Sequence, residues 1–298
     1  MFSMTEAATC KGYLQVRMED KREESRSLHW CRPHRLGPGC CLGLHLAGQD
    51  PISAFCPGSS YAGGVKPNTP QTAEALLGPL NDWEAKNAPE LLYTQGDTTL
   101  LRFVPRVSIV GTRKPTKLGV QRAKNLAHLL VKNDVLVVSG LAAGIDHTAH
   151  TSTIAAGGRT IAVIGTPLER AYPAAHRELQ QTIARDHLLV SQFAPGSEIF
   201  PSCFPKRNRT MALISHATVI IEAGAKSGCI SQGWEALRLG RSLFLTRSLV
   251  DNPGVEWTCR FLDHGAMILD SVEDLLDTLP TQTQPSQDGS PEVFCAFG

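Results

Sequence analysis

Seven apolar runs of strand length, separated by helical patterns, constrain the fold of this chain more than any other feature of its sequence. The runs span 106–111, 135–140, 160–165, 188–193, 217–223, 242–246 and 266–269. Helices are expected between them, near 117–132, 144–156, 174–186, 206–215, 227–239 and 254–264. Strands that are apolar along their whole length and alternate with helices are typical of a parallel sheet covered on both faces. The sequence therefore predicts an α/β fold with a doubly wound, mostly parallel sheet of the Rossmann-like type.

This alternation does not extend over the whole chain. Residues 1–68 are rich in Gly, Pro and Cys without a helical or strand period, which predicts a poorly structured extension or one that arises from a misassigned start codon. A zinc knuckle is the alternative there, although its adjacent cysteines lack the usual CxxC spacing; its ligands would be Cys31, His34, Cys40 and Cys41. Residues 69–280 form the predicted domain, opening with a helical stretch over 69–87 and a short strand over 89–97. Residues 281–298 are expected to be a flexible tail.

Charge is distributed unevenly, although the formal net charge is only +1. Eight Lys or Arg residues and no acidic residue lie between Leu100 and Lys132, whereas the chain from Phe261 onward has seven acidic residues and no Lys or Arg. Such a basic stripe indicates either a local anion site or solvated helix faces. No apolar run is long enough for a membrane span, and the N-terminus lacks the apolar core of a signal peptide, so we expect a cytoplasmic protein.

Ligands of doubly wound sheets bind at the carboxyl ends of the strands, so the loops after the strands indicate the function. Gly111, Thr112 and Arg113 follow the first run. A glycine lets the backbone approach a ligand, the helix start suits a phosphate, and Arg113 adds a bidentate anion donor. The loop is neither GxGxxG nor a Walker A sequence, which disfavours nicotinamide cofactors and ATP. A tight turn with a surface arginine is the alternative interpretation.

A second loop follows the run 135–140 and brings Ser139 and Gly140 to the same crevice. Asp146, His147 and His150 come next. These side chains are compatible with metal or acid–base chemistry, but such residues more often cap and pack a helix. We therefore predict no catalytic residue and no metal site.

The third feature is the stretch FPKRNR, which places three cations in four residues before an apolar run. If this stretch begins a helix at the same edge of the sheet, Lys206 and Arg209 converge with Arg113 on one anionic groove. Asn208 can hydrogen-bond to a base, a sugar or a phosphate. Phe204 offers a ring on which a base can stack, a contact worth roughly 1–3 kcal/mol in single-strand binders; core packing is its alternative role.

Five motifs in order resemble the DprA/Smf family of DNA-processing proteins: VSIVGTRKPTKLG, VVSGLAAGIDHTAH, TIAVIGTPLERAYPAAHREL, FPKRNRTMALIS and VIIEAGAKSG. The resemblance covers about residues 89–276. It implies an extended Rossmann-like domain that binds single-stranded DNA without strong sequence preference, forms homodimers, and helps to load a RecA-type recombinase onto incoming strands in natural transformation. It implies DNA contacts at Gly111, Thr112, Arg113, Ser139, Gly140, Phe204, Lys206, Asn208 and Arg209, with Ser227 and Gly228 near the rim.

The chain departs from the family pattern in its C-terminal part. Cys229, Gln232 and Gly233 stand where the family usually has Ser, Thr and Ala, and Trp257 and Cys259 stand where Gly-x-Asn is expected. The sequence LTRS replaces a VPG after the sixth of the seven runs. In the family this part lies near the pocket edge and the dimer surface, so the departures bear on dimerisation and on recombinase contact.

The prediction is a non-catalytic single-stranded DNA-binding protein without a cofactor, in which Arg113, Lys206 and Arg209 hold phosphates and Phe204 stacks a base. The alternative is a nucleotide-binding or nucleotide-hydrolysing enzyme of the related LOG group, which uses a PGGxGT loop and a catalytic glutamate. This chain has EAGAKSG at that place, with Glu222 before it but without the loop. A nucleotide-sensing module in defence or signalling shares the fold and stays open as a third function.

Overall fold

The computed structural model describes residues 66–102, 105–225 and 227–280, and every structural statement below concerns this part of the chain. The cysteines and histidine considered for a zinc knuckle lie outside it. Residues 1–65 of the predicted N-terminal extension and the whole predicted tail over 281–298 also lie outside it.

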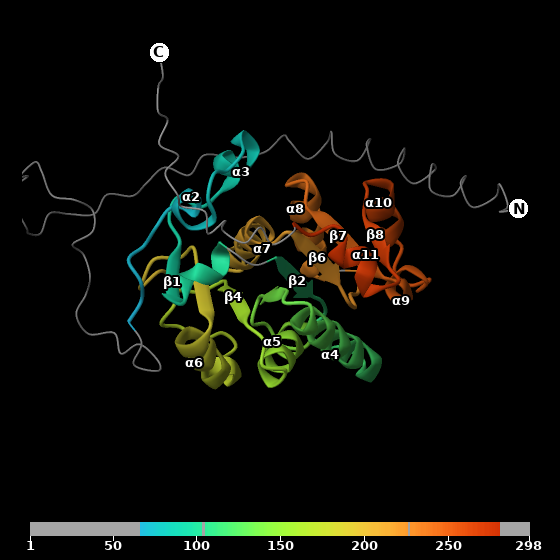
Figure 1. The fold of residues 1–298 in the computed structure, drawn as a ribbon, viewed down its shortest axis with the longest axis horizontal. Coiled ribbons are helices and arrows are strands. Elements are labelled where there is room, and N and C mark those ends of the chain that lie inside the picture. The colour runs from blue at the N-terminus through green and yellow to red at the C-terminus, as the bar shows by residue number, and fades with distance from the viewer. Residues whose placement is uncertain (1–65, 103–104, 226, 281–298) are drawn as a thin grey trace, which may run out of the picture. The chain divides into compact units, whose positions relative to one another are not determined.

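The described residues form one eight-stranded sheet with the order β1–β5–β4–β3–β2–β6–β7–β8 (Figure 1). The strands are β1 (Tyr93–Gly96), β2 (Arg106–Val110), β3 (Leu136–Ser139), β4 (Thr160–Ile164), β5 (Leu188–Ser191), β6 (Ala217–Ile220), β7 (Ser242–Thr246) and β8 (Met267–Leu269). Neighbouring strands pair in parallel, except that β1 pairs antiparallel with β5. The predicted α/β fold with a mostly parallel sheet is confirmed.

Helices cover both faces of the sheet (Figure 1). One face carries α4 (Lys117–Lys132), α5 (Ile145–Ala155), α6 (Arg177–Asp186) and α11 (Val272–Leu276), and the other carries α7 (Cys203–Ile214), α8 (Cys229–Arg238) and α10 (Trp257–Asp263). Alternate residues of β2 serve the two layers, since Val107 and Ile109 pack with α4 and α5 whereas Val110 packs with the α7 side. This two-sided burial explains why the strands are apolar throughout.

The region before the parallel strands differs from the prediction of one helical stretch over 69–87. It forms two short helices, α2 (Ala73–Leu77) and α3 (Asp82–Asn87). Gly78 ends α2 with a φ of +92°, and Pro79 follows. A left-handed glycine and a residue without a backbone donor stop the first helix, so the chain starts a second one, capped by Asn81.

The fold reverses its direction of growth at β2. The chain builds β3, β4 and β5 on one side of β2 and then returns to place β6, β7 and the short α9 (Arg247–Val250) on the other side. The carboxyl ends of β2 and β6 are therefore neighbours at a topological switch point, where doubly wound folds bind their ligands. Among the helices that the structure describes, none has the length and apolarity that a membrane crossing requires.

Candidate nucleic-acid interface

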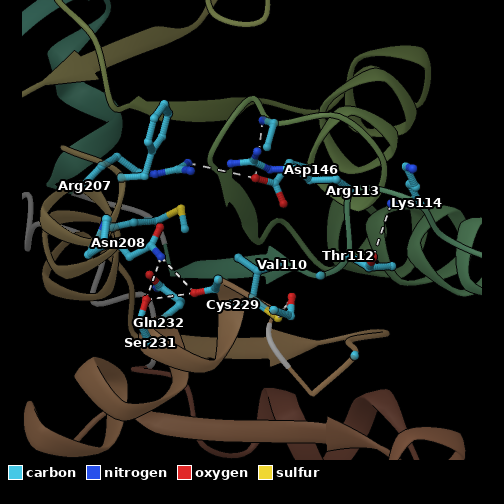
Figure 2. Close-up of a pocket in the computed structure, with 18 residues that line it drawn as sticks. Val110, Thr112, Arg113, Lys114, Asp146, Arg207, Asn208, Cys229, Ser231 and Gln232 are labelled. Atoms are coloured by element: carbon cyan, nitrogen blue, oxygen red, sulfur yellow. Dashed lines mark hydrogen bonds and ion pairs between the residues drawn. The ribbon is translucent and has the colours of Figure 1, made fainter. Parts of the chain in front are cut away.

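Two pockets adjoin at the carboxyl edge of the sheet and share four residues: Arg113, Ala142, Phe204 and Arg207. The first pocket, of about 630 Å³, lies between the β2–α4 loop, α7 and the start of α8 (Figure 2). The second pocket, of about 520 Å³, lies between the β3–α5 loop, α7 and the β4–α6 segment. Together the two pockets form a continuous hollow along this edge, with Arg113 and Phe204 at their common wall.

Backbone contacts hold the β2–α4 loop, which presents Arg113 to the pockets. A Cβ atom on Gly111 would lie 2.7 Å from Ile145 Cγ1 and 2.9 Å from the Glu222 carbonyl oxygen, so only glycine fits the turn. The Thr112 backbone N–H donates to the same carbonyl at 2.7 Å. Arg113 is exposed, and its guanidinium carbon lies 5.8 Å from the centre of the Phe204 ring. The loop thus aims a cation at both pockets.

The start of α4 is not available to a phosphate, contrary to the expectation from sequence. The carboxylate of Glu222 lies there and accepts from the Thr116 backbone N–H at 3.1 Å and from the Thr116 hydroxyl at 2.7 Å. A Cβ atom on Gly119 would lie 2.0 Å from Glu222 Oε2, so the glycine makes room for this carboxylate. A negative group of the chain itself therefore occupies the positive end of the helix dipole.

Arg207 is a pocket residue that sequence reasoning missed. Its side chain is only 7% exposed and lines both pockets, its Nη1 donates to the Val163 carbonyl at 3.1 Å, and Nη1 lies 3.9 Å from Asp146 Oδ2 (Figure 2). Arg207 Nε is buried without a hydrogen-bond partner among the described residues. Burial raises the pKa of the Asp146 carboxyl, and the Arg207 guanidinium opposes that shift. A buried cation and a buried carboxylate thus form the floor of the hollow.

The burial of Arg207 also explains Gly140. A Cβ atom at this position would lie 1.4 Å from Arg207 Nη1 and 2.7 Å from Asp146 Oδ2. Glycine is therefore required after β3 because the Arg207 side chain occupies the space that a Cβ atom would take. The signal for Arg207 is present in the sequence, because it shares a helical spacing of four and then three residues with the buried Met211 and Ile214.

Phe204 packs against the protein and also borders both pockets. Its ring is half-buried and touches the backbone near Gly165, where a Cβ would lie 2.9 Å from Phe204 Cδ1, yet it lines both pockets. The structure starts α7 at Cys203, three residues earlier than predicted, so Phe204 lies in the first turn of this helix. The ring therefore forms the pocket wall from a fixed position.

Asn208 points into the first pocket but uses its amide donors within the protein. Its Nδ2 donates to the Gly228 carbonyl at 3.1 Å and to the Ser231 hydroxyl at 2.9 Å (Figure 2). These bonds connect α7 to the start of α8 and place Ser227 and Gly228 on the pocket lining, as predicted. Cys229 and Gln232, two of the departures from the family pattern, line the same pocket.

Three predicted site residues do not line either pocket. Ser139 is fully buried and donates to the Ile109 carbonyl at 2.7 Å. Lys206 and Arg209 are exposed on α7, outside the pocket linings. Arg209 Nε lies 3.3 Å from Glu235 Oε2, a carboxylate from α8 that is distant in sequence. Of the three cations of FPKRNR, Arg207 therefore forms the pocket floor, Arg209 is exposed but ion-paired, and Lys206 is exposed without an ion pair to another described residue.

The histidines after β3 have structural roles. His150 is fully buried, its Nδ1 lies 2.8 Å from the Thr160 hydroxyl, and burial lowers its pKa to about 3. The His147 ring contacts the His176 ring at a centroid distance of 4.7 Å. In the part of the chain that the structure describes, no group of three or more potential metal ligands is present. His150 and His147 thus pack α5 against its neighbours, whereas Asp146 lies at the pocket floor.

A hollow lined by arginine, an aromatic ring and glycine turns at the switch point of a doubly wound sheet defines a Rossmann-like protein with a candidate ligand site at the carboxyl edge of its sheet. Residues 77–280 match the profile of the family described as DNA recombination-mediator protein A. The chain belongs to this family, the DprA/Smf proteins.

Similar proteins agree with this assignment. The chain is 38% identical over 195 residues to the DNA processing protein DprA of Streptococcus pneumoniae, covering 65% of this chain and 68% of that one. It is 33% identical to DprA of Bacillus subtilis, covering 64% of this chain and 65% of that one.

Two solved structures share the fold. The X-ray structure of S. pneumoniae DprA has a TM-score of 0.62 at 32% identity, covering 71% of this chain and 74% of that one. A structure of DprA from Helicobacter pylori, described for its single-stranded DNA binding mode, also has a TM-score of 0.62, at 28% identity, covering 73% of this chain and 97% of that one.

Proposed function

We propose that this protein binds single-stranded DNA along the carboxyl edge of its sheet, without catalysis, and acts as a recombination mediator. The observation that carries the proposal is Arg113, exposed above the Phe204 ring at the common wall of the two pockets. A guanidinium beside an aromatic face combines a phosphate donor with a stacking surface, the pairing on which single-strand binders rely.

The charges around the hollow favour a polyanion. Arg113 and Lys114 are exposed at its mouth, and Lys206 lies on the adjoining turn of α7. Arg207 adds a cation at the floor that is only partly neutralised by Asp146 at 3.9 Å. Phosphates would contact Arg113 and Lys206, and a base would stack on Phe204. Arg209 has a weaker role than expected from sequence, because Glu235 already pairs with it.

An enzymatic function of the LOG type has less support. The glutamate that would serve it, Glu222, accepts hydrogen bonds from Thr116 and crowds against Gly119 at the start of α4. A carboxylate held in this way is directed away from a substrate in the pockets. The test for this alternative is release of a free base from a nucleoside monophosphate, which we expect not to occur.

Loading of a RecA-type recombinase and homodimerisation are proposed on family membership. Two of the C-terminal departures, Gly233 and Trp257, belong to a packed cluster: Trp234 stacks on Phe261 at a centroid distance of 4.3 Å, and Trp257 packs edge-on with the same ring at 5.3 Å. Gly233 provides the space, since a Cβ there would lie 2.9 Å from Phe261. These substitutions therefore fit a well-packed α8–α10 surface, and light scattering of the purified chain would measure whether it dimerises.

The experiment that tests the proposed function is fluorescence-anisotropy binding of the full chain to labelled oligo-dT and to duplex DNA across a salt series. We expect a preference for the single strand and an affinity that falls steeply with salt, because phosphate contacts release counterions. Arg113→Ala should weaken binding about tenfold and reduce the salt slope by about 0.7, the value for one single-strand phosphate contact.

Arg185→Ala is the matched control. Arg185 is equally an exposed arginine, but it lies at the far end of α6, at the opposite edge of the sheet, and pairs with Asp186. A flat salt response, or equal affinities of Arg113→Ala and the wild type, would contradict the proposal.

A further inference from the structure

The second pocket contains an aromatic side chain that the proposed function does not use. The segment between β4 and α6 folds over the carboxyl edge and brings Tyr172 beside Phe204, with ring centroids 5.3 Å apart and planes tilted by 44°. Tyr172 is 49% exposed, although it lines a pocket. A large exposed ring at the wall of an open pocket is a surface on which a planar ligand can stack.

The polar groups around Tyr172 match a nucleotide. Arg170 and Arg177 line the second pocket and are exposed, and neither forms an ion pair with another described residue. Glu169 is the one carboxylate on this lining; its Oε1 accepts from the Gly196 backbone N–H at 2.7 Å, while its Oε2 is buried without a partner among the described residues. The pocket therefore offers two arginines that can donate to a phosphate, together with one carboxylate.

Arg207 supplies an independent sign that the hollow is incomplete as it stands. Its side chain is 7% exposed and its Nε has no hydrogen-bond partner in the described chain, yet it lines the second pocket as well as the first. Buried polar groups are usually satisfied, and an unsatisfied guanidinium nitrogen beside an open pocket is typical of a site that a polar ligand completes.

We propose that the second pocket is a separate nucleotide subsite, in which Tyr172 stacks a base and Arg170 and Arg177 hold the adjacent phosphate. This inference rests on the proposed function and extends it, since it makes a bound strand run from the first pocket past Arg113 into the second. The Glu169 carboxylate would repel a phosphate, so the backbone of the strand lies on the side of the two arginines and the base edge faces Glu169.

The subsite has a signature that a general loss of binding would not produce. A short oligonucleotide can occupy the first pocket alone, whereas a longer one reaches Tyr172. Single-strand sites span roughly 4 to 16 nucleotides per domain, so oligo-dT of these lengths brackets the transition. Removal of the ring should therefore weaken the binding of long oligonucleotides and leave the shortest ones that bind unaffected.

The test compares the wild-type full chain with Tyr172→Ala, Tyr172→Phe and Trp83→Ala by anisotropy over this series of lengths. Trp83 is a matched control, because it is a similarly exposed aromatic residue on α3 that lines neither pocket. We expect Tyr172→Ala to lose roughly tenfold in affinity for the long oligonucleotides only, and the other two variants to bind like the wild type, since Tyr172→Phe keeps the ring. Thermal melting of each variant shows whether it is folded.

A second measurement places the base directly. Oligonucleotides with one 5-bromodeoxyuridine at successive positions are irradiated on the wild-type chain, and cross-linked peptides are identified by mass spectrometry. We expect the Tyr172 peptide to cross-link at one position and the Phe204 peptide at a different one.

The outcomes separate the two proposals. If wild-type binding depends on Arg113 but Tyr172→Ala matches the wild type at every length, the subsite is refuted and the proposed function stands. An equal loss at every length would also refute a separate subsite, because Tyr172 would then belong to a single site. If the wild-type chain does not bind single strands at all, the proposed function fails, and the subsite fails with it.

Discussion

Gly140→Ala is the substitution for which the structure makes the sharpest prediction. The new methyl carbon would lie 1.4 Å from Arg207 Nη1 and 2.4 Å from Arg207 Cζ, far inside contact distance. The backbone itself tolerates alanine, because Gly140 is not among the glycines with positive φ. The guanidinium must therefore move, and with it the bond to the Val163 carbonyl and the pairing with Asp146.

The size of the effect follows from what Arg207 can do instead. Overpacking a filled interior costs typically 1–3 kcal/mol, and removing one partner of a buried ion pair costs about 3–5 kcal/mol. Arg207 borders an open pocket, so it can swing toward solvent and recover part of its hydration, which places the expected loss near the lower range. We expect Gly140→Ala to reduce the free energy of unfolding by about 2 kcal/mol.

Urea denaturation measures this loss as a shift of the midpoint at constant slope. Gly228→Ala is the control: it lines the first pocket, but a Cβ there would meet no atom within 4 Å. Gly140→Ala should also weaken oligo-dT binding, because a displaced Arg207 side chain would enter the hollow. A Gly140→Ala protein as stable as Gly228→Ala would refute the reasoning that Arg207 and Asp146 are fixed by packing.

Two further predictions concern charge. Burial lowers the pKa of His150 to about 3, whereas an unfolded histidine titrates near 6.5. Below pH 6.5 only the unfolded chain therefore gains this proton. The free energy of unfolding should fall as the pH is lowered, by up to about 2 kcal/mol between pH 6.5 and 5. Urea titrations at several pH values should show this slope, and His150→Asn should flatten it; a slope unchanged in that variant would contradict the assignment. Glu235→Gln should release Arg209 from its ion pair and raise the affinity for single-stranded DNA about two- to fivefold at low salt in the same anisotropy assay. A reduced affinity, or a gain that does not depend on salt, would contradict this prediction.

The architecture could be predicted from the sequence because its signals are local. Each strand of the parallel part is apolar along its length, and each predicted helix between them is present within a few residues of its expected bounds. The break between α2 and α3 was also readable, since Gly78 and Pro79 are adjacent. Local periodicity and turn residues thus decide element type, and the rule for parallel sheets decides which loops meet.

The partners of charged side chains could not be predicted in the same way. Arg209 meets Glu235, and Glu222 meets Thr116, because the sheet order brings distant segments to one edge. From sequence, only the helical spacing to Met211 and Ile214 distinguishes Arg207 from Arg209, and the helix turns the first into the protein and the second outward. The expectation of phosphate at the start of α4 failed for the same reason, since it depended on a carboxylate more than a hundred residues away.

The carboxylate at the start of α4 also determines how the protein meets the small anions of a cell. A free nucleotide that approached this helix would have to displace Glu222, which is tethered to the next strand and is present there at an effective concentration of at least the millimolar order. A mononucleotide would therefore have to compete with Glu222 at the position where many related folds hold a phosphate. Glu222 thus occupies the start of α4, and the open hollow beside it is accessible to ligands that bind through several contacts at once.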